Sequence, residues 1–490
     1  MSGTFGENAL NFFSGTKDFY PHTIGQSLRF NNDDASYLSR THTTGNRQTF
    51  TLSVWFKRSD IGSAGSKYFL HTSLSGSGLG SYLYINSSGS LRYYDTNTTI
   101  CTTSGVFRDD AAWYNMVFAV DFTQSTGTNR VKIYVNGTQQ TVTFTDDKST
   151  SFNSYFNSNI AHYISTSDSN GMDGYLADMN FIDGQQLTPS SFGETKAGIW
   201  VPIDTSGLTF GTNGFRLTFE GTGTGTTSAG TTAQTNIGDD QSGGGHNWAV
   251  TNIVSTDVVL DSPTNNWCTL SSNASIGTQS EGNLKQVTAV SGSGIAAGSI
   301  GQTSGKWYWE VNVNNSSTAD LIGVVDETFD SVNSGSYVGY LLSGGKDSIA
   351  YYSNGNRYIN GSAASYGATY TTGDIIGVAL NLDDNEITFY KNNSSQGAIS
   401  HTFSGGNILP AVCDGTSSSS VSTFILNFGQ DSSFAGTETA QGNPDSRGIG
   451  DFYYSPPSGF LALCTANLPN PGIDPAQDEE PADNFNTVLY

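Results

Sequence analysis

The stretch RVKIYVNG, residues 130–137, decides the class of fold. Its valines and isoleucine fall at every second position, the period of a strand with one face buried and one face wet. Asn136-Gly137 then supplies the positive φ angles of a type I′ hairpin turn. EITFYKNN, residues 386–393, repeats the pattern in the other half of the chain. The sequence therefore predicts an all-β protein with two β-sandwiches in series.

Length and composition support this architecture. The chain has 490 residues, too many for one core, so two or three domains are expected. Charged residues make up 13%, about half the usual share, while glycine is abundant and aromatic residues reach 12%. Ample aromatic residues argue against disorder, and strand formers interrupted by Gly, Asn and Ser favour β structure.

The charge balance limits the partners. The net charge is −23, from 43 acidic and 20 basic residues without a basic cluster, so nucleic acid and anionic membranes are not expected partners. No apolar run approaches the ~20 residues of a membrane span, so no insertion is expected. The N-terminal MSGTFGENALNFF has no signal-peptide pattern, which predicts synthesis in a cytosol. Four scattered cysteines are expected to be free buried thiols: Cys101, Cys268, Cys413 and Cys464.

Residues 27–200 form the first predicted sandwich. Its motifs are the Trp55-Phe56 strand, the strand Trp113–Asp121, KIYVNG, and the closing GYLADMNFIDGQQLT at 174–188. As a set they resemble the concanavalin A-like jelly roll of the laminin-G type. Residues 201–262 are rich in Gly, Thr and Ser and are expected to form a connector with some strand content of its own.

Residues 263–440 form the second predicted sandwich. GKWYWEV at 305–311 is followed by GDIIGVALNLD at 373–383, ITFYKN at 387–392 and ILPAV at 408–412. This succession resembles a SPRY domain. Residues 441–490 are expected to be an acidic, Pro-containing C-terminal tail.

Residues 1–26 form an N-terminal arm rich in aromatic residues. Such residues either dock on a partner or pack back on the first sandwich. Those concerned are Phe5, Phe12, Phe13, Phe19 and Tyr20.

No catalytic set is recognisable. The six histidines are isolated, and no HExxH, GxSxG or P-loop pattern occurs. Jelly rolls of this kind include glycoside hydrolases, which need two carboxylates in one cleft. In such jelly rolls the two acids usually lie on one strand, and that spacing does not occur here. The chain is therefore not expected to be an enzyme, and a carbohydrate-active enzyme is the least favoured alternative.

Calcium is the one cofactor that the sequence leaves open. Jelly rolls of this type often bind calcium at the rim, and oxygen ligands come from loops. Asp33, Asp34 and Asp173 are the candidate ligands. The favoured alternative is that these aspartates are solvated turn residues.

Tyrosines are the remaining binding signal. In SYLYI, Tyr82 and Tyr84 alternate with apolar residues and should face outward, and Tyr93 and Tyr94 lie on the return strand. Exposed tyrosines suit sugar stacking, although ordinary cross-strand pairing gives the same pattern. A hairpin of the second sandwich offers a second candidate group: Tyr351, Tyr352, Asn354 and Tyr358.

The two modules together resemble the repeat-built fibre proteins of tailed bacteriophages of marine bacteria, cyanobacteria especially. The phrases that carry this resemblance are SLRFNNDDASYLSRT at 27–41, DSPTNNW at 261–267 and NFNTVLY at 484–490. It implies a tail fibre or other virion appendage, made in the host cytoplasm, that contacts other virion proteins and binds host surface glycans. Residues 1–26 would then be the virion anchor. It also implies a homo-oligomer, usually a trimer, although no heptad or collagen-like repeat occurs. The alternative is a capsid or tail decoration protein with purely structural contacts.

Overall fold

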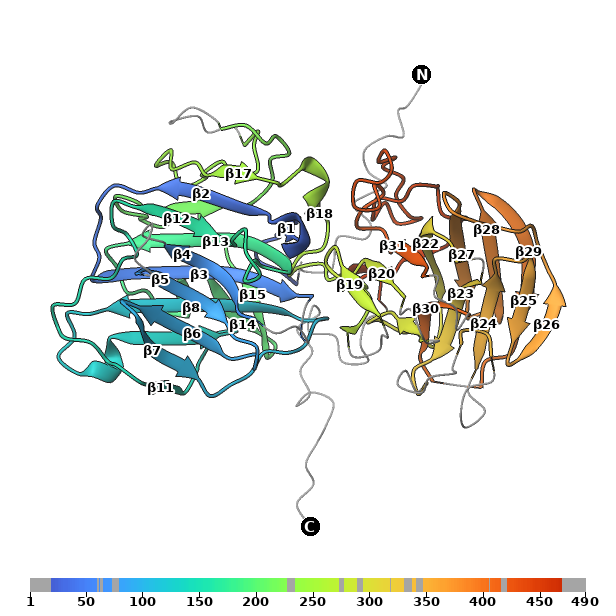
Figure 1. Cartoon of the computed structure of the whole chain (residues 1–490), viewed down its shortest axis with the longest axis horizontal. Coiled ribbons are helices and arrows are strands. Elements are labelled where there is room, and N and C mark those ends of the chain that lie inside the picture. Colours follow the sequence, from blue (N-terminus) through green and yellow to red (C-terminus); the bar gives the residue numbers. More distant parts are fainter. Residues whose placement is uncertain are drawn as a thin grey trace, which may run out of the picture.

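The computed structural model describes residues 19–59, 61, 65–72, 79–226, 234–272, 277–288, 294–317, 319–329, 337–340, 347–404, 406–415 and 421–468. Two β-sandwiches lie side by side, domain 1 at the left of Figure 1 and domain 2 at the right. The helical elements that lie wholly within these residues are short 3₁₀ turns: η1 (Asn32–Asp34), η2 (Gly127–Asn129), η3 (Pro189–Ser191), η4 (Ser255–Asp257) and η6 (Thr465–Asn467). The predicted all-β fold is confirmed.

Domain 1 contains two large sheets. Sheet 1 has the order β10-β9-β8-β3-β13-β1-β18, with β16 also paired to β13. Sheet 2 has the order β11-β7-β6-β5-β4-β12-β2-β17. The strands of sheet 1 are β1 (Ser27–Phe30), β3 (Thr49–Arg58), β8 (Trp113–Asp121), β9 (Val131–Val135), β10 (Thr138–Gln139), β13 (Gly174–Asp183), β16 (Phe215–Leu217) and β18 (Val258–Val259). Those of sheet 2 are β2 (Tyr37–Thr41), β4 (Lys67–Thr72), β5 (Ser81–Ile85), β6 (Leu91–Asp95), β7 (Thr98–Thr103), β11 (Val142–Phe144), β12 (Ala161–Ile164) and β17 (Ala249–Thr251).

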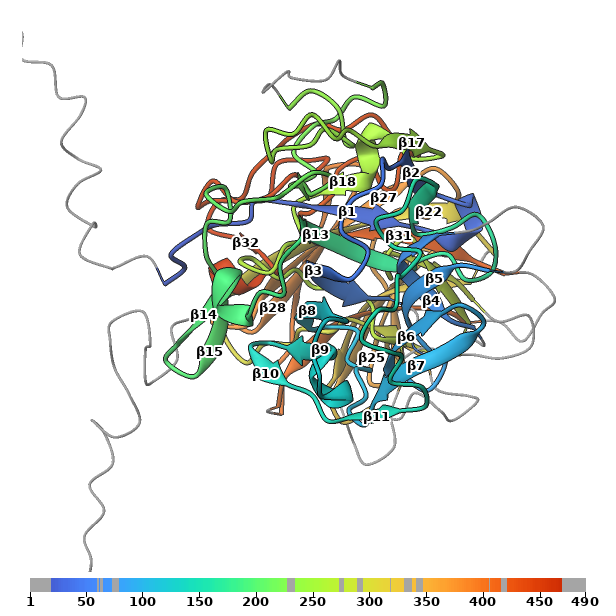
Figure 2. The same ribbon diagram turned by 90° about the vertical axis from the view of Figure 1, so that its left-hand side faces the viewer.

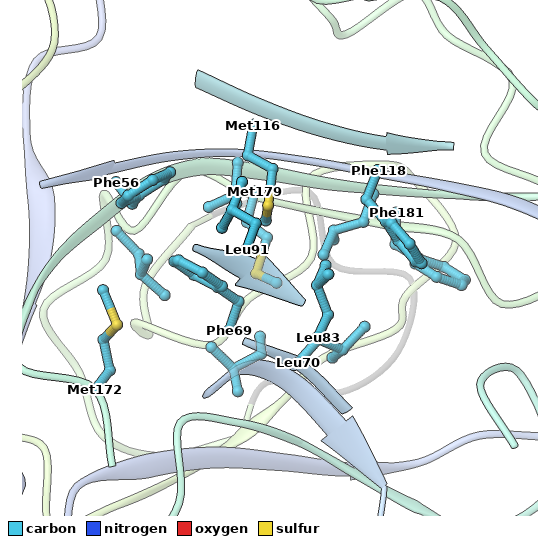
Figure 3. Packing of buried hydrophobic residues seen from close by; sticks show 14 of the residues in the cluster. Phe56, Phe69, Leu70, Leu83, Leu91, Met116, Phe118, Met172, Met179 and Phe181 are labelled. Atoms are coloured by element: carbon cyan, nitrogen blue, oxygen red, sulfur yellow. The ribbon is translucent and has the colours of Figure 1, made fainter. Parts of the chain in front are cut away.

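The core of domain 1 lies between these sheets. Figure 3 shows Phe56, Met116 and Phe181 of sheet 1 facing Phe69 and Leu83 of sheet 2. Period-2 alternation accounts for this, since every second residue of each strand points to the same face.

The alternation in residues 130–137 predicted that the outer face of sheet 1 would be exposed to solvent. That face is instead covered. Tyr134 is only 9% exposed and packs in a cluster with Phe192 and Phe210. The chain after β13 supplies this cover, including the hairpin of β14 (Gly193–Lys196) and β15 (Ile199–Pro202). In the end-on view of Figure 2 this hairpin lies outside the layer that contains β8 and β9. A short-range pattern could not show that a later segment folds over the face.

Residues 201–262 extend both sheets of domain 1. β16 pairs with β13 and β18 with β1 in sheet 1, whereas β17 pairs with β2 in sheet 2. The strand content expected of this segment is therefore present, and the segment is built into the first sandwich.

Domain 2 also contains two sheets. Sheet 3 has the order β19-β20-β31-β22-β27-β28-β29, with β32 also paired to β22, and sheet 4 the order β21-β30-β23-β24-β25-β26. The strands of sheet 3 are β19 (Thr278–Ser280), β20 (Lys285–Val287), β22 (Lys306–Asn315), β27 (Ile375–Asn381), β28 (Glu386–Lys391), β29 (Ser394–Ser400), β31 (Thr423–Asn427) and β32 (Leu461–Ala462). Those of sheet 4 are β21 (Ala296–Ala297), β23 (Asp320–Asp326), β24 (Ser348–Tyr352), β25 (Asn356–Ile359), β26 (Ser362–Ser365) and β30 (Ile408–Asp414).

The predicted type I′ turn is confirmed. Asn136 and Gly137, between β9 and β10, have φ angles of 47° and 75°. Asn360-Gly361, between β25 and β26, repeats this geometry with 48° and 86°. The four cysteines are free and buried, also as predicted. The described part of the chain has no helix long and apolar enough to cross a membrane.

Buried ion pairs join the two domains. Arg29 of β1, whose side chain is 1% exposed, makes ion pairs with Asp431 at 2.9 Å, Asp257 at 3.3 Å and Glu281 at 3.5 Å. Lys57 of β3 forms a 2.8 Å ion pair with Asp261 and also donates to the carbonyl of Trp267, in domain 2, at 3.1 Å. Because Glu281 and Asp431 belong to domain 2, these contacts hold the two sandwiches in a fixed relation.

Candidate functional site: an aromatic face on domain 1

The outer face of sheet 2 carries aromatic side chains from five neighbouring strands, which we call the tyrosine row. Strand register aligns most of its members, because Tyr163 is opposite His71, His71 opposite Tyr82, and Tyr82 opposite Tyr94. The row consists of Tyr37 (β2), Tyr163 (β12), His71 (β4), Tyr82 (β5) and Tyr94 (β6).

The rings of the row contact one another without a break. The His71 ring is stacked on Tyr163, with centroids 5.0 Å apart, and on Tyr82, at 5.7 Å. Tyr37 and Tyr94 continue the row with edge contacts to Tyr163 and Tyr82, at 5.9 and 5.6 Å. Flat rings held at these spacings form a ready-made surface for stacking.

A hollow of about 390 Å³ lies over the middle of the row. Tyr68 adds a wall, with its ring 5.3 Å from Tyr82. The loop after β12 contributes polar groups through Thr166, Ser167 and Asp168. Aromatic surfaces with hydroxyl and carboxylate groups at the edge suit a polyhydroxylated ligand, whose C–H faces stack while its hydroxyls form hydrogen bonds.

His71 takes part as a neutral ring. Burial lowers its pKa to about 4, so it is uncharged at neutral pH. Its Nε2 lies 3.0 Å from the carbonyl oxygen of Ser165, so this nitrogen carries the proton and donates it. The hydrogen bond fixes the plane in which the ring stacks.

The tyrosines of domain 1 that were predicted to bind a ligand differ in how far they are exposed, and they fall into three groups. Tyr82 and Tyr94 lie in the row and are partly exposed. Tyr84 faces outward as expected but is only 9% exposed, because Tyr68 and Arg92 pack on its ring. Tyr93 was wrongly expected to be available, since it is buried in the core and its hydroxyl donates to Asp95 at 2.7 Å. Adjacent residues of a strand face opposite ways, so Tyr93 and Tyr94 cannot share a face.

The sequence reasoning missed Tyr37, Tyr68, His71 and Tyr163. Tyr37 precedes the buried Leu38 and Tyr163 precedes the buried Ile164, which was a usable signal for an outward position. Their meeting on one face depends on pairing between strands far apart in the sequence.

In domain 2 the tyrosine group is partly covered. Tyr352 and Tyr358 contact each other at 5.6 Å, and Tyr340 is stacked on Tyr358 at 5.0 Å. Asn354 is exposed at the turn before β25 and accepts a hydrogen bond from the N–H of Asn356. The prediction that Tyr351 is available to a ligand is wrong, because Tyr351 is fully buried and its hydroxyl donates to the carbonyl of Ala368. As with Tyr93, its neighbour in the strand takes the outward position.

The three candidate calcium ligands lie near one end of domain 1. Asp173 accepts from the N–H of Asn32 at 2.7 Å, so its loop does approach η1. Its other oxygen forms a 2.7 Å ion pair with Lys67, which already balances its charge. Asp34 accepts from the side chain of Asn31, and Asp33 is exposed. The described residues contain no group of three acidic, His or Cys side chains that could hold a metal ion.

The N-terminal anchor residues are described only in part. Phe5, Phe12 and Phe13 lie outside the described residues. Phe19 contacts Tyr20 edge-on at 5.0 Å, and the ammonium of Lys196 in β14 lies 5.3 Å from its ring. These two residues therefore pack back on domain 1.

An Asp–His–Ser grouping in domain 2 lacks the order of a catalytic triad. His401 and Ser404 both bind the carboxylate of Asp347, at 2.8 and 2.6 Å. In a triad the serine hydroxyl would instead donate to the histidine. Burial would raise the pKa of Asp347, but hydrogen bonds from Ser404, His401 and Asn360 lower it to about 2. The Asp347 carboxylate therefore links its own segment to the segment of Asn360 and to that of His401 and Ser404.

Comparison with known proteins identifies both modules. Residues 30–191 match the model of the concanavalin A-like lectin/glucanases superfamily, and residues 306–430 match the SPRY domain. The solved SPRY domain of human HERC1 is 20% identical, with 32% of this chain and 96% of that chain covered and a TM-score of 0.28. Stonustoxin is also 20% identical, with 33% and 27% covered and a TM-score of 0.28. No curated protein matched the sequence. The chain thus carries a concanavalin A-like domain followed by a SPRY domain, as the sequence motifs had indicated.

Proposed function

We propose that this chain is an adhesion protein of a tailed-phage virion and that the tyrosine row binds glycans of the host surface. The observation that carries the proposal is the row itself, aromatic side chains from five strands beside a polar hollow. The motifs that resemble phage fibre proteins support the virion assignment. Weak stacking contacts suffice for adhesion when many copies bind at once.

The negative charge of the chain indicates which class of glycan it is expected to bind. The chain has a net charge of −23, and Asp168 lies at the edge of the hollow. Arg92 does not line the hollow, and its guanidinium lies 5.9 Å from the ring of Tyr84. A polyanionic glycan would be repelled, so the expected ligands are neutral or amino-bearing sugars.

The test is binding of the purified chain to neutral polysaccharides extracted from the host envelope. Tyr82→Ala should weaken binding about tenfold, because the central ring of the row is lost. Tyr352→Ala, a matched change on domain 2, should leave it unaltered. Equal binding by the Tyr82→Ala and unmodified chains would contradict the proposed site.

Competition with phage adsorption tests the virion assignment separately. Excess purified chain should slow adsorption of a phage that carries it, and Tyr82→Ala should compete poorly. A particle density map that places the tyrosine row against neighbouring virion proteins would favour the decoration role instead.

A further inference from the structure

The side chain of Lys57 in β3 ends at the junction of the two domains, beside a carboxylate and a side-chain amide. Its Nζ lies 2.8 Å from Oδ2 of Asp261 and 2.8 Å from Oδ1 of Asn266. The Lys57 side chain is 1% exposed and that of Asp261 is fully buried. An amine, a carboxylate and an amide therefore meet at one point that is largely shielded from water.

Aromatic side chains surround this point. The ring of Tyr175, which is fully buried, has its centroid 5.8 Å from the Nζ of Lys57. The indole N–H of Trp113 donates to Oδ1 of Asp261 at 2.9 Å, so the carboxylate has a fixed orientation with Oδ2 toward Lys57. Transfer of one proton from the ammonium to this carboxylate removes two opposite charges from surroundings of low dielectric. The contact therefore offers a route to a neutral, nucleophilic amine.

The amide of Asn266 is held in one orientation toward this amine. Its Nδ2 donates to the carbonyl oxygen of Ala111 at 2.7 Å, so Oδ1 faces Lys57. Its backbone is fixed as well, because its N–H donates to the Thr465 hydroxyl and its carbonyl accepts from the Thr465 N–H, both at 2.9 Å. A nucleophile held in contact with an acyl group reacts as if it were present at a very high concentration. The arrangement therefore favours attack of Nζ on Cγ of Asn266.

We propose that Lys57 and Asn266 form an intramolecular isopeptide bond, with Asp261 as the proton carrier. Asp261 takes a proton from Nζ, and the neutral amine attacks Cγ of Asn266. The Nζ–Cγ bond forms, the Cγ–Nδ2 bond breaks, and Nδ2 leaves as an ammonium ion with the protons that Nζ has given up. Asp261 passes these protons on and is again a carboxylate at the end. Nothing is oxidised or reduced, and no further reactant is needed.

The bond would join domain 1 covalently to the first residues of domain 2. Lys57 and Asn266 are 209 positions apart in the sequence, so the bond closes a loop that contains most of domain 1. Such a loop restricts the unfolded chain, as a disulfide of the same span would. The link would also hold the two sandwiches together under a pulling force. This inference goes beyond glycan binding and does not depend on it.

Intact-mass spectrometry of the purified full chain tests the proposal. The unmodified chain should be lighter than its sequence by the mass of one ammonia, and a protease digest should contain a branched peptide that joins Lys57 to Asn266. A full calculated mass would overturn the proposal. So would a loss of ammonia that maps only to a linear peptide, such as the one with Asn136-Gly137, because that loss is succinimide formation in the backbone.

Asn266→Ala removes the acyl group and keeps the ion pair of Lys57 with Asp261, so this variant should fold and show its full calculated mass. Asn265→Ala is the matched control. The Asn265 side chain accepts from the N–H of Ala466 at 3.0 Å, and this variant should lose ammonia as the unmodified chain does. On a denaturing gel the Asn266→Ala chain should also migrate more slowly than the looped chain.

Two further variants test the chemistry itself. Lys57→Arg keeps a positive charge beside Asp261 without a nucleophilic amine, and it should show its full calculated mass even if Asn266→Ala folds poorly. Asp261→Ala keeps both reacting groups and should slow formation of the bond at least about a hundredfold in a time course. A loss of ammonia that persists in Asn266→Ala or Lys57→Arg would overturn the proposal, and an unchanged rate in Asp261→Ala would contradict the role of Asp261 as proton carrier.

Discussion

The domain junction and the histidine pair of domain 1 both bury ionisable groups, but in opposite charge states. At the junction Arg29 remains charged: burial lowers its pKa, and Asp431, Glu281 and Asp257 more than offset that effect. His42 and His162 are stacked at 3.8 Å, beside Phe215 and Trp248, and no carboxylate of the described residues shifts the pKa of either ring. Burial lowers the pKa of both, so the pair is neutral.

The difference shows two ways of removing an ionisable side chain from water. Pairing keeps the charge and makes each partner depend on the others, so losing one leaves uncompensated charges. A side chain that is neutral in the fold needs no charged partner, but its protonation in acid lowers the stability of the fold. The junction should therefore respond strongly to mutation, and the histidine pair to pH.

Arg29→Met should have the largest effect. It leaves the buried Asp431 and the half-buried Asp257 and Glu281 without their cation, a loss of about 3–5 kcal/mol in unfolding free energy. Urea denaturation measures it, and Arg447→Met, at an exposed position, is the control. Equal stability of the two variants would show that the ion pairs do not hold the junction.

Acidification should have the next largest effect. His42 and His162 bind protons in the unfolded chain below about pH 6.5 but resist them in the fold, where the pKa of His162 is about 3. The contribution of these two histidines to stability is thus fully present above pH 6.5 and falls as pH decreases, by up to about 1.4 kcal/mol per pH unit for each histidine.

His42→Phe separates the contribution of one histidine. Neither ring nitrogen of His42 has a hydrogen-bond partner within the described part of the chain, so phenylalanine keeps the stacking and loses no such bond. The variant should lower the slope of unfolding free energy against pH by the share of one histidine, up to about 1.4 kcal/mol per pH unit. An unchanged slope would rule out a protonation cost at this residue.

Some of these features were predictable from sequence and others were not. Alternation and Asn-Gly turns are local, so the sandwiches and the turn at Asn136-Gly137 followed directly. Alternation also placed Tyr82 outward, and applied strictly it would have excluded Tyr93 and Tyr351. Strand register between distant segments brings Tyr163 beside His71, and Arg29 meets Asp431 from 402 residues away. No local pattern encodes such meetings.

Gly282→Ala should disturb the junction to a lesser extent. The Tyr175 hydroxyl donates to the Gly282 carbonyl at 2.7 Å, and a Cβ on Gly282 would lie 2.1 Å from that hydroxyl oxygen. Gly459 has a φ of 85°, similar to the 66° of Gly282, and a Cβ added at Gly459 would have nothing within 4 Å. Gly282→Ala should therefore cost about 1–3 kcal/mol more than Gly459→Ala in denaturation. Equal losses of unfolding free energy in the two variants would mean that the residues around Gly282 shift to accept the Cβ without loss of stability.

The smallest expected effect of pH is on the proposed binding of glycans. His71, in the middle of the tyrosine row, has a pKa of about 4, so its ring stays neutral on mild acidification. Affinity per folded molecule should therefore be constant between about pH 8 and pH 5.5, while unfolding free energy already falls. Titration calorimetry against a bound neutral polysaccharide, scaled to the folded fraction from circular dichroism, measures both. An affinity that fell near pH 6.5 and became flat in His71→Phe would show that His71 is protonated in the row, in contradiction to its burial as a neutral ring.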